Sequence, residues 1–529
     1  MPPKRSFKRV SSWAYCPPGT KHTACLNSYA HNYVYDGEVE HVNKHVRKVG
    51  KSLEYFSGTK VYKRHPGAER ILNLDNDTIY APTHWGPEAY VKAFEKHDYA
   101  EPMEMSAVEV EEYMQVLWDE YGYMYGSETT PILCTSKPYN TSSGVPYKFQ
   151  YKQESDFIHH HGLEPYHCLL EALKTQRVHV PWYAFPKSEI LKRSKIEDQD
   201  IRFIQCAPCT FTRIGAYFEH VMNDRQKVNL DRQAQVGWTP LKGGLAEVLS
   251  RFNACVEFME LDWTRYDGTI SRELFNLVSR HRARCLSAPE ETLKAYVNYR
   301  KALIDRLVVY SNGDMYHINR GNPSGQFSTS TDNCMFQTIL IYSELKAWAH
   351  DMGLGDITPD NYKQHLVTIS YGDDRLTGYF SHAMVPSPAW LVNFYRRKWG
   401  MWVKKENVKF SATLEGLSFC GMTITKKGGY FEPHFKSEKI YAALAEPAKR
   451  VLDDDTMECK LASMRILLAN QDDKFAHRVS SACDLWEREV GSLPVNRDDA
   501  LAILVGRTKN ASRQSSDIFV DSCNRLRGE

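Results

Sequence analysis

Val367-Thr-Ile-Ser-Tyr-Gly-Asp-Asp-Arg-Leu-Thr-Gly-Tyr-Phe380 is a run of strand-forming residues interrupted by Gly372, Asp373 and Asp374. The β-branched and aromatic residues on both sides predict two strands, and the glycine between them predicts a tight hairpin turn. Two like charges at one point are unfavourable unless a cation shares the site. Mg²⁺ prefers carboxylate oxygens and keeps coordination positions open for phosphate. The hairpin tip therefore predicts metal-assisted chemistry on phosphates.

Length and composition narrow the class of protein. A chain of 529 residues is too long for one simple core and predicts two or three subdomains. The net charge of +2 means that a nucleic-acid partner must be held by local basic patches. Thirteen cysteines without a framework spacing favour free thiols in a reducing compartment. No apolar run reaches 18 residues, so we expect no transmembrane segment.

Residues 41–70 form a basic stretch with interleaved aromatic residues. Such a stretch suits contact with an RNA backbone, and a solvated charged face explains the same pattern. Its members are Lys44, Arg47, Lys48, Lys51, Lys60, Lys63, Arg64 and Arg70, with Tyr55, Phe56 and Tyr62.

Hydrophobic periodicity predicts an order of helices and strands that is typical of an α+β sheet domain with large insertions. The chain should be mostly helical after residue 436. We expect helices over residues 100–125, 163–177, 270–285, from 333 onward and 388–402, a buried strand over 256–261, and a hairpin formed by 414–424 and 428–435.

A second acidic motif follows the strand predicted over residues 256–261. Asp262 should lie where this strand leaves the sheet, and Asp267 lies five residues further on. Beside the Asp373 turn, Asp262 would supply another ligand for two shared metal ions. Two such ions clamp the attacking and leaving oxygens of an in-line phosphoryl transfer.

A loop rich in glycine, proline and serine, Gly321-Asn-Pro-Ser-Gly-Gln-Phe-Ser-Thr-Ser-Thr-Asp-Asn333, leads into the long helix predicted from residue 333. Its glycines allow the backbone to approach a ligand closely. Ser324, Thr329 and Asn333 add small hydrogen-bonding groups, of which the last two should share one helix face. Such a face suits recognition of a ribose 2′-hydroxyl, although a capped helix start explains the loop equally well.

Together these three blocks resemble the palm motifs of viral RNA-dependent RNA polymerases, and their wording is most similar to astrovirus and astro-like polymerases. Three further motifs extend the resemblance over about residues 141–421. Thr141-Ser-Ser-Gly-Val-Pro146 resembles the motif where the template enters, Asp200-Ile-Arg-Phe-Ile204 resembles the finger motif at the triphosphate, and Leu417-Ser-Phe-Cys-Gly421 resembles the primer-grip hairpin.

The resemblance implies an α+β right-hand polymerase with fingers, palm and thumb, whose antiparallel palm sheet is flanked by helices. The thumb would be small and helical, which predicts an open channel that accepts a protein primer or an oligonucleotide. The implied regions are 1–220 (fingers with an N-terminal extension), 221–270 (palm), 271–315 (fingers insertion), 316–435 (palm) and 436–529 (thumb).

The resemblance also implies a role for each site residue. Asp262 and Asp373 would be the main ligands of two Mg²⁺ ions, which Mn²⁺ can replace, with Asp374 and the Trp263 carbonyl in support. Residues implied to bind the nucleotide are Arg202 at the triphosphate, Ile204 at the template base, and Asp267, Ser324, Gly325, Thr329 and Asn333 at the sugar. Residues implied to contact template or primer are Thr141, Ser142, Gly144, Pro146, Phe419, Cys420 and Gly421.

Two lysine assignments rest on spacing that does not choose between neighbours. Among Lys404, Lys405 and Lys409 we select Lys409 as the general acid toward pyrophosphate. Lys192, in a basic cluster with Arg193 and Lys195, would line the nucleotide channel, and a solvated charge run explains that cluster equally well.

The implied function is RNA synthesis from ribonucleoside triphosphates on an RNA template, for viral genome replication and transcription. The implied partners are template and product RNA, a VPg-like protein primer and other replicase proteins. The protein would be released from a viral polyprotein and act in the host cytoplasm at membrane-associated replication complexes. The alternatives are a reverse transcriptase, which the sugar-reading residues disfavour, and a catalytically silent RNA-binding scaffold, which should lack a metal ligand.

Three other features carry no assignment. Cys206 and Cys209, and the His159–His161 run, have spacings too incomplete to predict a zinc site. Arg375 would either balance the neighbouring carboxylates or touch the primer.

Overall fold

The computed structural model of the chain describes residues 33–34, 40–52, 71–72, 74–145, 147–178, 180–310, 314–449, 451 and 453–506. Pro146, predicted to contact the template, lies outside the described residues. So do the basic N-terminal residues and residues 53–70 of the basic stretch. Within the described ranges, no helix has the length and apolar character needed to cross a bilayer.

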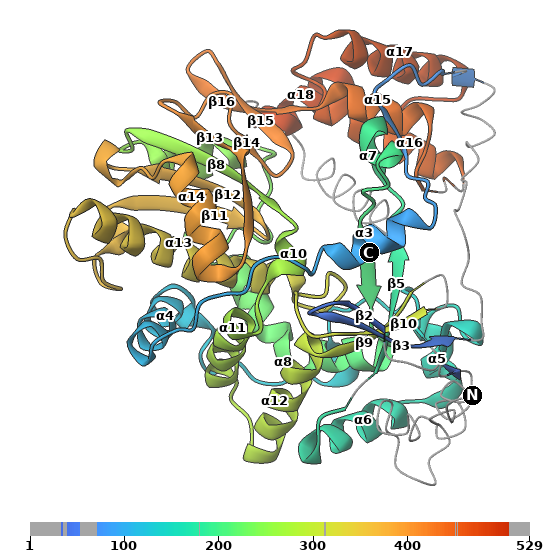
Figure 1. The fold of residues 1–529 in the computed structure, drawn as a ribbon. Coiled ribbons are helices and arrows are strands. Elements are labelled where there is room, and N and C mark those ends of the chain that lie inside the picture. The colour runs from blue at the N-terminus through green and yellow to red at the C-terminus, as the bar shows by residue number, and fades with distance from the viewer. Residues whose placement is uncertain are drawn as a thin grey trace.

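A four-stranded antiparallel sheet lies at the centre of the predicted palm (Figure 1). The hairpin is confirmed, since Tyr371 pairs with Asp374 and leaves Gly372 and Asp373 as a two-residue turn. Gly372 has φ +63°, a conformation that glycine adopts without strain. The strand order is β11 (Leu366–Tyr371), β12 (Asp374–Tyr379), β8 (Glu257–Thr264) and β13 (Trp402–Ser411).

Strand β8 continues three residues beyond the predicted end at Leu261. Asp262 therefore lies within the strand and not at the point where the chain leaves the sheet. The extension arises because β13 continues to pair beside it, through Val403 with Trp263 and Trp402 with Thr264. The tertiary pairing extends a strand whose local sequence gave no sign of continuing.

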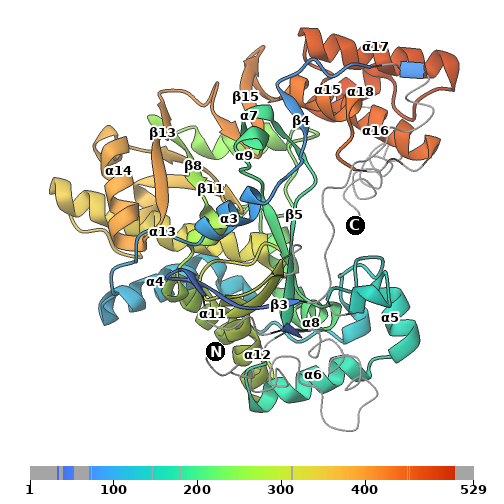
Figure 2. The ribbon, with the colours of Figure 1, turned by 45° about the vertical axis from the view of Figure 1, so that its right-hand side comes forward.

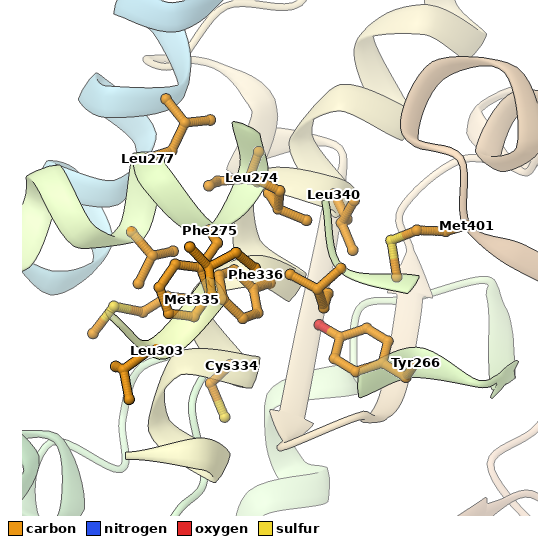
Figure 3. Packing of buried hydrophobic residues seen from close by; sticks show 14 of the residues in the cluster. Tyr266, Leu274, Phe275, Leu277, Leu303, Cys334, Met335, Phe336, Leu340 and Met401 are labelled. Carbon is orange, nitrogen blue, oxygen red and sulfur yellow. The ribbon is translucent and has the colours of Figure 1, made fainter. Parts of the chain in front are cut away.

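Helix α13 (Thr329–Met352) packs against the sheet and is the most deeply buried helix near the predicted site. It begins four residues before the predicted start at Asn333. Figure 3 shows its residues Cys334, Met335, Phe336 and Leu340 among side chains of the predicted fingers insertion. Around α13 lie α4 (Ala107–Tyr121), α11 (Arg272–Cys285) and α14 (Pro388–Phe394), which continues as one π-helical turn over Tyr395–Trp399.

A second, seven-stranded sheet belongs to the predicted fingers (Figures 1 and 2). Its path is β1 (Tyr33–Val34), β3 (Val46–Ser52), β10 (Asp314–Ile318), β9 (Arg306–Tyr310), β5 (Pro181–Pro186) and β7 (Phe203–Cys206), with β2 (Glu40–Asn43) paired to β3. The helices of this region are α5 (Glu154–His161), α6 (Glu164–Thr175), α8 (Cys209–Val228) and α12 (Glu290–Ile304). The predicted boundary at residue 315 falls inside β10, which pairs with β9 in this sheet.

The predicted hairpin over residues 414–435 contains an additional turn. Cys420 and Gly421 connect β14 (Ser418–Phe419) to β15 (Met422–Lys427), which then pairs with β16 (Tyr430–Phe435). Both turn residues have positive φ, as a type I′ hairpin turn requires.

The last described helices form the predicted thumb and contact an early segment of the chain. Leu72 packs in their apolar core, Tyr441 donates to the Asp75 carbonyl at 2.9 Å, and Asn76 donates to Glu446 at 2.8 Å. Figures 1 and 2 show this segment running up to the thumb. The helices are α15 (Ser437–Ala445), α16 (Asp454–Leu467), α17 (Lys474–Glu489) and α18 (Arg497–Val505).

Short elements complete the connections between these regions. They are β4 (Tyr80–Pro82), β6 (Ile190–Lys192), α3 (Glu88–Glu95), α7 (Arg193–Glu197), α9 (Gly244–Leu249) and α10 (Tyr266–Thr269).

Candidate active site

Strand register brings the predicted metal ligands together. The ladder between β12 and β8 pairs Arg375 with Leu261, and the next residues along the two strands are Asp374 and Asp262. Asp373 lies in the adjoining turn. Two carboxylates of one hairpin thus meet a third from a strand more than 100 positions earlier in the chain.

The three carboxylates repel one another. Their side chains reach solvent, but the surrounding protein desolvates them. Burial, followed by the charges of Asp373, Asp262 and Glu260, raises the pKa of Asp374 to about 7. Burial and the charge of Asp262 also raise the pKa of Asp373, and burial raises that of Asp262. The mutual repulsion shows that these groups share one electrostatic environment that a cation would stabilise.

Helix α13 supports the turn between the carboxylates. The Gly372 amide donates to the Cys334 sulfur at 3.3 Å, and Gln337 donates to the Asp373 carbonyl at 2.8 Å. Sequence reasoning missed both supporting residues. Gln337 is one of several buried polar residues of α13, with Thr338 and Ser343 among the others, so polarity in the sequence alone would not have singled it out.

The donor set fits divalent ions that arrive together with a substrate. Within the described ranges, no three His, Cys, Asp or Glu side chains are already gathered into a metal-binding group. Mg²⁺ ordinarily binds one or two protein carboxylates and fills its other positions with phosphate and water. Asp262, Asp373 and Asp374 provide such an incomplete set, and neighbouring carboxylates add to the burial that raises the pKa values of Asp373 and Asp374.

The predicted sugar-reading residues are only partly brought together. Asn333 donates to the Asp267 carboxylate at 2.8 Å, and Asn322 donates to the Asn333 side-chain oxygen at 2.8 Å. Burial and the charge of Asp373 raise the pKa of Asp267 to about 7, so the Asp267–Asn333 pair lies within electrostatic reach of a predicted metal ligand. Asn322 was not predicted.

The remaining residues of the loop serve its packing as well. The Thr329 hydroxyl donates to the Pro323 and Gln326 carbonyls at 3.0 and 3.1 Å, so it stabilises the loop and does not contact Asp267 or Asn333. Ser324 is exposed and lies 3.4 Å from the Phe203 carbonyl of β7. A Cβ on Gly325 would lie 2.1 Å from the Gln205 carbonyl oxygen, so only glycine allows this close packing against β7.

Arg202 lies on β7's side of the site, within electrostatic reach of Asp373 and Asp267. Its guanidinium forms two contacts with Glu189, one of 2.7 Å, and remains 60% exposed. The Glu189 hydrogen bonds raise the pKa of Arg202, with smaller contributions from Asp373 and Asp267. Ile204 lies in β7 opposite Phe185 and is half-buried.

Among the described residues, neither predicted lysine has a hydrogen bond or ion pair with Asp262, Asp373 or Asp374. Lys192 is exposed at the end of β6. The charge of its neighbour Lys195 partly offsets the burial that raises the pKa of Asp262. Lys409 donates to the Gly416 carbonyl at 2.5 Å and pairs with Glu260 on the next strand. Sequence reasoning missed Lys436, whose charge acts on both Asp262 and Glu260.

The motif predicted to meet the template packs at the start of α8. Thr141 accepts from Lys137 at 3.0 Å and Ser142 is exposed. Gly144 has φ +70°, and a Cβ there would lie 2.7 Å from the Ala207 carbonyl oxygen.

The predicted primer grip borders the carboxylates. Phe419 is buried, and it anchors the turn formed by Cys420 and Gly421. Burial, together with the charges of Asp374 and Asp373, raises the pKa of the Cys420 thiol. The Trp263 ring packs against Tyr395 at 4.7 Å, and its backbone belongs to β8 beside Asp262.

Arg375 has neither of the two roles considered for it. It is fully buried and forms a bidentate ion pair with Glu344, at 2.7 and 2.8 Å. The pair points into the core, away from the hairpin tip.

The two cysteines of the Cys206–Cys209 motif are packed thiols. Burial raises their pKa values to about 11 and 12, respectively.

Comparisons with known proteins agree with this geometry. A family model described as viral RNA-dependent RNA polymerase matches residues 36–482. Non-structural polyprotein 1AB of Turkey astrovirus 2 is 36% identical over 435 residues, which cover 79% of this chain and 26% of the polyprotein. The corresponding polyprotein of Mink astrovirus 1 is 35% identical over 448 residues, 80% of this chain and 32% of the polyprotein. The chain thus spans about a quarter to a third of these relatives.

A solved structure shows the same fold. The Sicinivirus 3Dpol RNA dependent RNA polymerase superposes with a TM-score of 0.62, covering 83% of this chain and 94% of that one at 16% identity. The α+β right-hand fold predicted from the motifs is therefore confirmed. Because the family model spans most of its length, the chain belongs to the viral RNA-dependent RNA polymerases.

Proposed function

We propose that this chain extends an RNA strand from ribonucleoside triphosphates on an RNA template by two-metal nucleotidyl transfer. The observation that carries the proposal is the register of β12 and β8, which sets Asp374 beside Asp262 at the Asp373 turn. The unbalanced charge of these three groups, expressed in their raised pKa values, suits two divalent cations.

The proposed roles follow from position. When bound, two Mg²⁺ or Mn²⁺ ions would lower the pKa of the attacking 3′-hydroxyl and stabilise the leaving pyrophosphate. Asp262 and Asp373 hold the ions, with Asp374 and the Trp263 carbonyl in support. Arg202 exchanges part of its contact with Glu189 for the triphosphate, since both offer oxygens to the same guanidinium fork.

Sugar, base and primer would be held by the residues around this centre. Asp267 and Asn333 read the 2′-hydroxyl, and Ser324 and Gly325 form the adjoining backbone surface. Ile204 packs near the template base. Thr141, Ser142, Gly144 and Pro146 would guide the template, Phe419, Cys420 and Gly421 would support the primer end, and Thr329 would act indirectly by holding the loop.

Two lysines, Lys192 and Lys409, are proposed to act at the edge of the site. Lys192 lines the outer channel, where Lys195 lies electrostatically closer to Asp262. Lys409 serves as general acid toward pyrophosphate in this proposal, which requires its ammonium group to leave the Gly416 carbonyl.

The regions of the hand are also proposals. We assign fingers to residues 1–220 and to an insertion from 271 that the fingers sheet extends to Ile318. The palm is formed by residues 221–270 and the part up to 435, and the thumb by 436–529. A small thumb leaves the channel open to a VPg-like protein primer or an oligonucleotide. Since its relatives are non-structural polyproteins, we propose that the chain is released from a viral polyprotein. It would then act with other replicase proteins at membrane-associated complexes in the host cytoplasm.

Primer extension on an RNA template with Mg²⁺ or Mn²⁺ tests the proposal. The wild type should incorporate UTP far better than dTTP, whereas a reverse transcriptase would prefer dTTP. Asp373→Ala should abolish incorporation while RNA binding persists and weakens steeply with salt. Undiminished incorporation by Asp373→Ala would place the chemistry elsewhere, and a wild type that binds RNA without incorporating nucleotides would identify the chain as a scaffold.

A further inference from the structure

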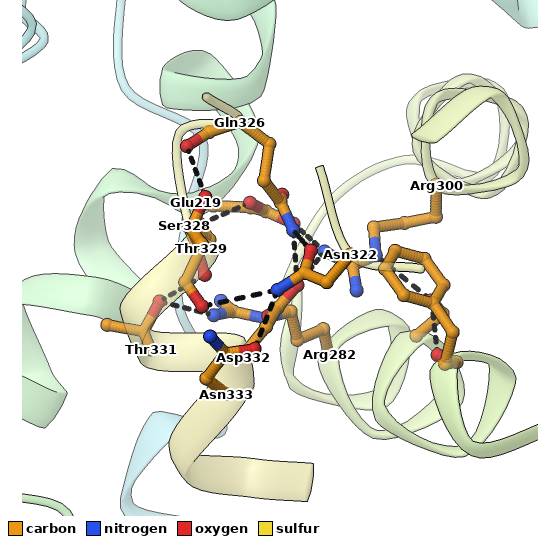
Figure 4. Close-up of polar contacts among 12 residues, drawn as sticks. Glu219, Arg282, Arg300, Asn322, Gln326, Ser328, Thr329, Thr331, Asp332 and Asn333 are labelled. Carbon is orange, nitrogen blue, oxygen red and sulfur yellow. Dashed lines mark hydrogen bonds and ion pairs between the residues drawn. The ribbon is translucent and has the colours of Figure 1, made fainter. Parts of the chain in front are cut away.

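A buried ion-pair lattice lies directly behind the sugar-reading residues (Figure 4). Asp332 accepts from Arg282 at 2.6 Å and from Arg300 at 2.8 Å, and Arg300 also donates to Glu219 at 3.0 Å. These four side chains are at most 2% exposed. Two positive and two negative charges balance one another, so the lattice is a fixed anchor within the protein.

A chain of amides leads from this anchor to the predicted sugar site. Gln326 donates to Asp332 at 3.0 Å and to the Asn322 side-chain oxygen at 2.5 Å. Asn322 donates in turn to the Asn333 oxygen at 2.8 Å. Asn333 finally donates to Asp267 at 2.8 Å. Every step runs in one direction, from amide nitrogen to the next oxygen.

The direction matters because a side-chain amide has a donor end and an acceptor end. Asp332 is held ionised by two arginines and accepts hydrogen bonds, which fixes the orientation of Gln326. The Asn322 donor fixes the oxygen end of Asn333, so the nitrogen of Asn333 must face Asp267. A reversed Asn333 amide would turn its oxygen toward the carboxylate, where the two would repel.

We propose that Asn322 and Gln326 are positioning residues that lock the orientation of the Asn333 amide and thereby set the preference for ribose over deoxyribose. The inference rests on the proposed function of Asp267 and Asn333 as the sugar-reading pair. With its nitrogen fixed, Asn333 presents one N–H to Asp267 and directs the other toward the position of a 2′-hydroxyl. Recognition of the sugar is therefore built partly by residues that never touch it.

The experiment compares kcat/KM for UTP and dUTP, which differ at the 2′ position alone, in primer extension by the full chain. Asn322→Leu removes the hydrogen bonds of the Asn322 amide with Gln326, Asn333 and the Thr329 carbonyl, and Asn322→Asp keeps the shape but replaces the donor with an acceptor. Each should lower the UTP/dUTP ratio about tenfold, the effect of one misplaced hydrogen bond. Gln326→Met should lower the ratio less, by about two- to threefold, since Asn322 still faces Asn333.

Thr331→Val is the matched control, because Thr331 hydrogen-bonds Arg282 and Asn223 in the same lattice but lies off the amide chain. It should lower thermal stability and leave the ratio unchanged. Should Asn322→Leu fail to fold, the near-isosteric Asn322→Asp and Gln326→Met variants provide the same readout. Unchanged ratios in the folded Asn322 and Gln326 variants of an active enzyme would overturn this inference alone. A wild type that incorporates neither nucleotide would overturn the proposed function and this inference with it.

Discussion

Acidic residues occupy opposite environments in two neighbouring regions of this molecule. In the lattice behind the sugar site, burial alone would raise the pKa of Asp332, but Arg300 and Arg282 lower it. At the hairpin tip, Asp374 reaches solvent, yet burial and three neighbouring carboxylates raise its pKa to about 7. The lattice is neutralised by the protein itself, whereas the tip is left with excess negative charge. The difference separates a structural acid, whose positive partners are arginines of the same chain, from the acids that we propose bind a cation.

The largest expected effect comes from removing a functional acid. Asp262→Asn should lower kcat for nucleotide incorporation on the order of 10³-fold or more, because a metal ligand contributes several kcal/mol to the transition state. Its thermal stability should not fall, since the change relieves repulsion. Primer extension and thermal unfolding measure the two effects, and a variant that unfolds earlier but remains active would reverse the comparison.

The corresponding change in the lattice should act on stability. Asp332→Asn removes a negative charge and leaves the buried Arg282 and Arg300 without full neutralisation. This should lower the free energy of unfolding by about 3–5 kcal/mol. Denaturant titration checks this value. Asp374→Asn is the matched control at the tip, where the same substitution should leave stability equal or higher. Equal losses for both variants would show that the two regions do not differ.

A smaller effect is expected from the residues that hold the tip in place. Gln337→Leu removes the donor to the Asp373 carbonyl and should reduce kcat about tenfold, with a higher Mg²⁺ requirement and little change in KM for the nucleotide. Ser343→Ala, which also removes a buried polar group from α13, serves as the control. If both variants keep the wild-type Mg²⁺ dependence, Gln337 does not position the turn.

A further expected effect is a difference in pH dependence. The folded state holds a proton on Asp374 up to about pH 7, whereas the unfolded chain releases it near its ordinary value of 3.8. The contribution of Asp374 to stability is therefore present at low pH and decreases as pH rises from about 4 to 7. Asp332 has the opposite sign, because its lowered pKa gives stability that is lost in acid.

Thermal unfolding of wild type and Asp374→Asn across pH 4–8 in EDTA isolates this contribution. The variant should gain stability relative to wild type as pH rises, and Mg²⁺ should narrow the gap near pH 7. A gap that is independent of pH would contradict the raised pKa.

The sequence carried much of this fold and site because several signals are local. The glycine turn between two strand-forming runs was sufficient to predict the hairpin. The order of the motifs was sufficient to predict, by resemblance, that Asp262 and Asp373 belong to one site. What sequence could not provide depends on tertiary pairing. β8 extends to Thr264 because β13 pairs beside it. Arg375 is buried in the core because Glu344 of α13 pairs with it there. Asn322 belongs to no periodic pattern in the sequence. Its role depends on the hydrogen bond to Asn333, eleven residues further along the chain.

The shared cation site at the hairpin tip is tested most directly by anomalous diffraction from Mn²⁺ in crystals of the enzyme with a primer–template RNA and a non-hydrolysable ribonucleotide. We expect two peaks between Asp262 and Asp373, both in contact with the triphosphate or the primer end. Peaks bound elsewhere, or none within reach of both carboxylates, would contradict this account.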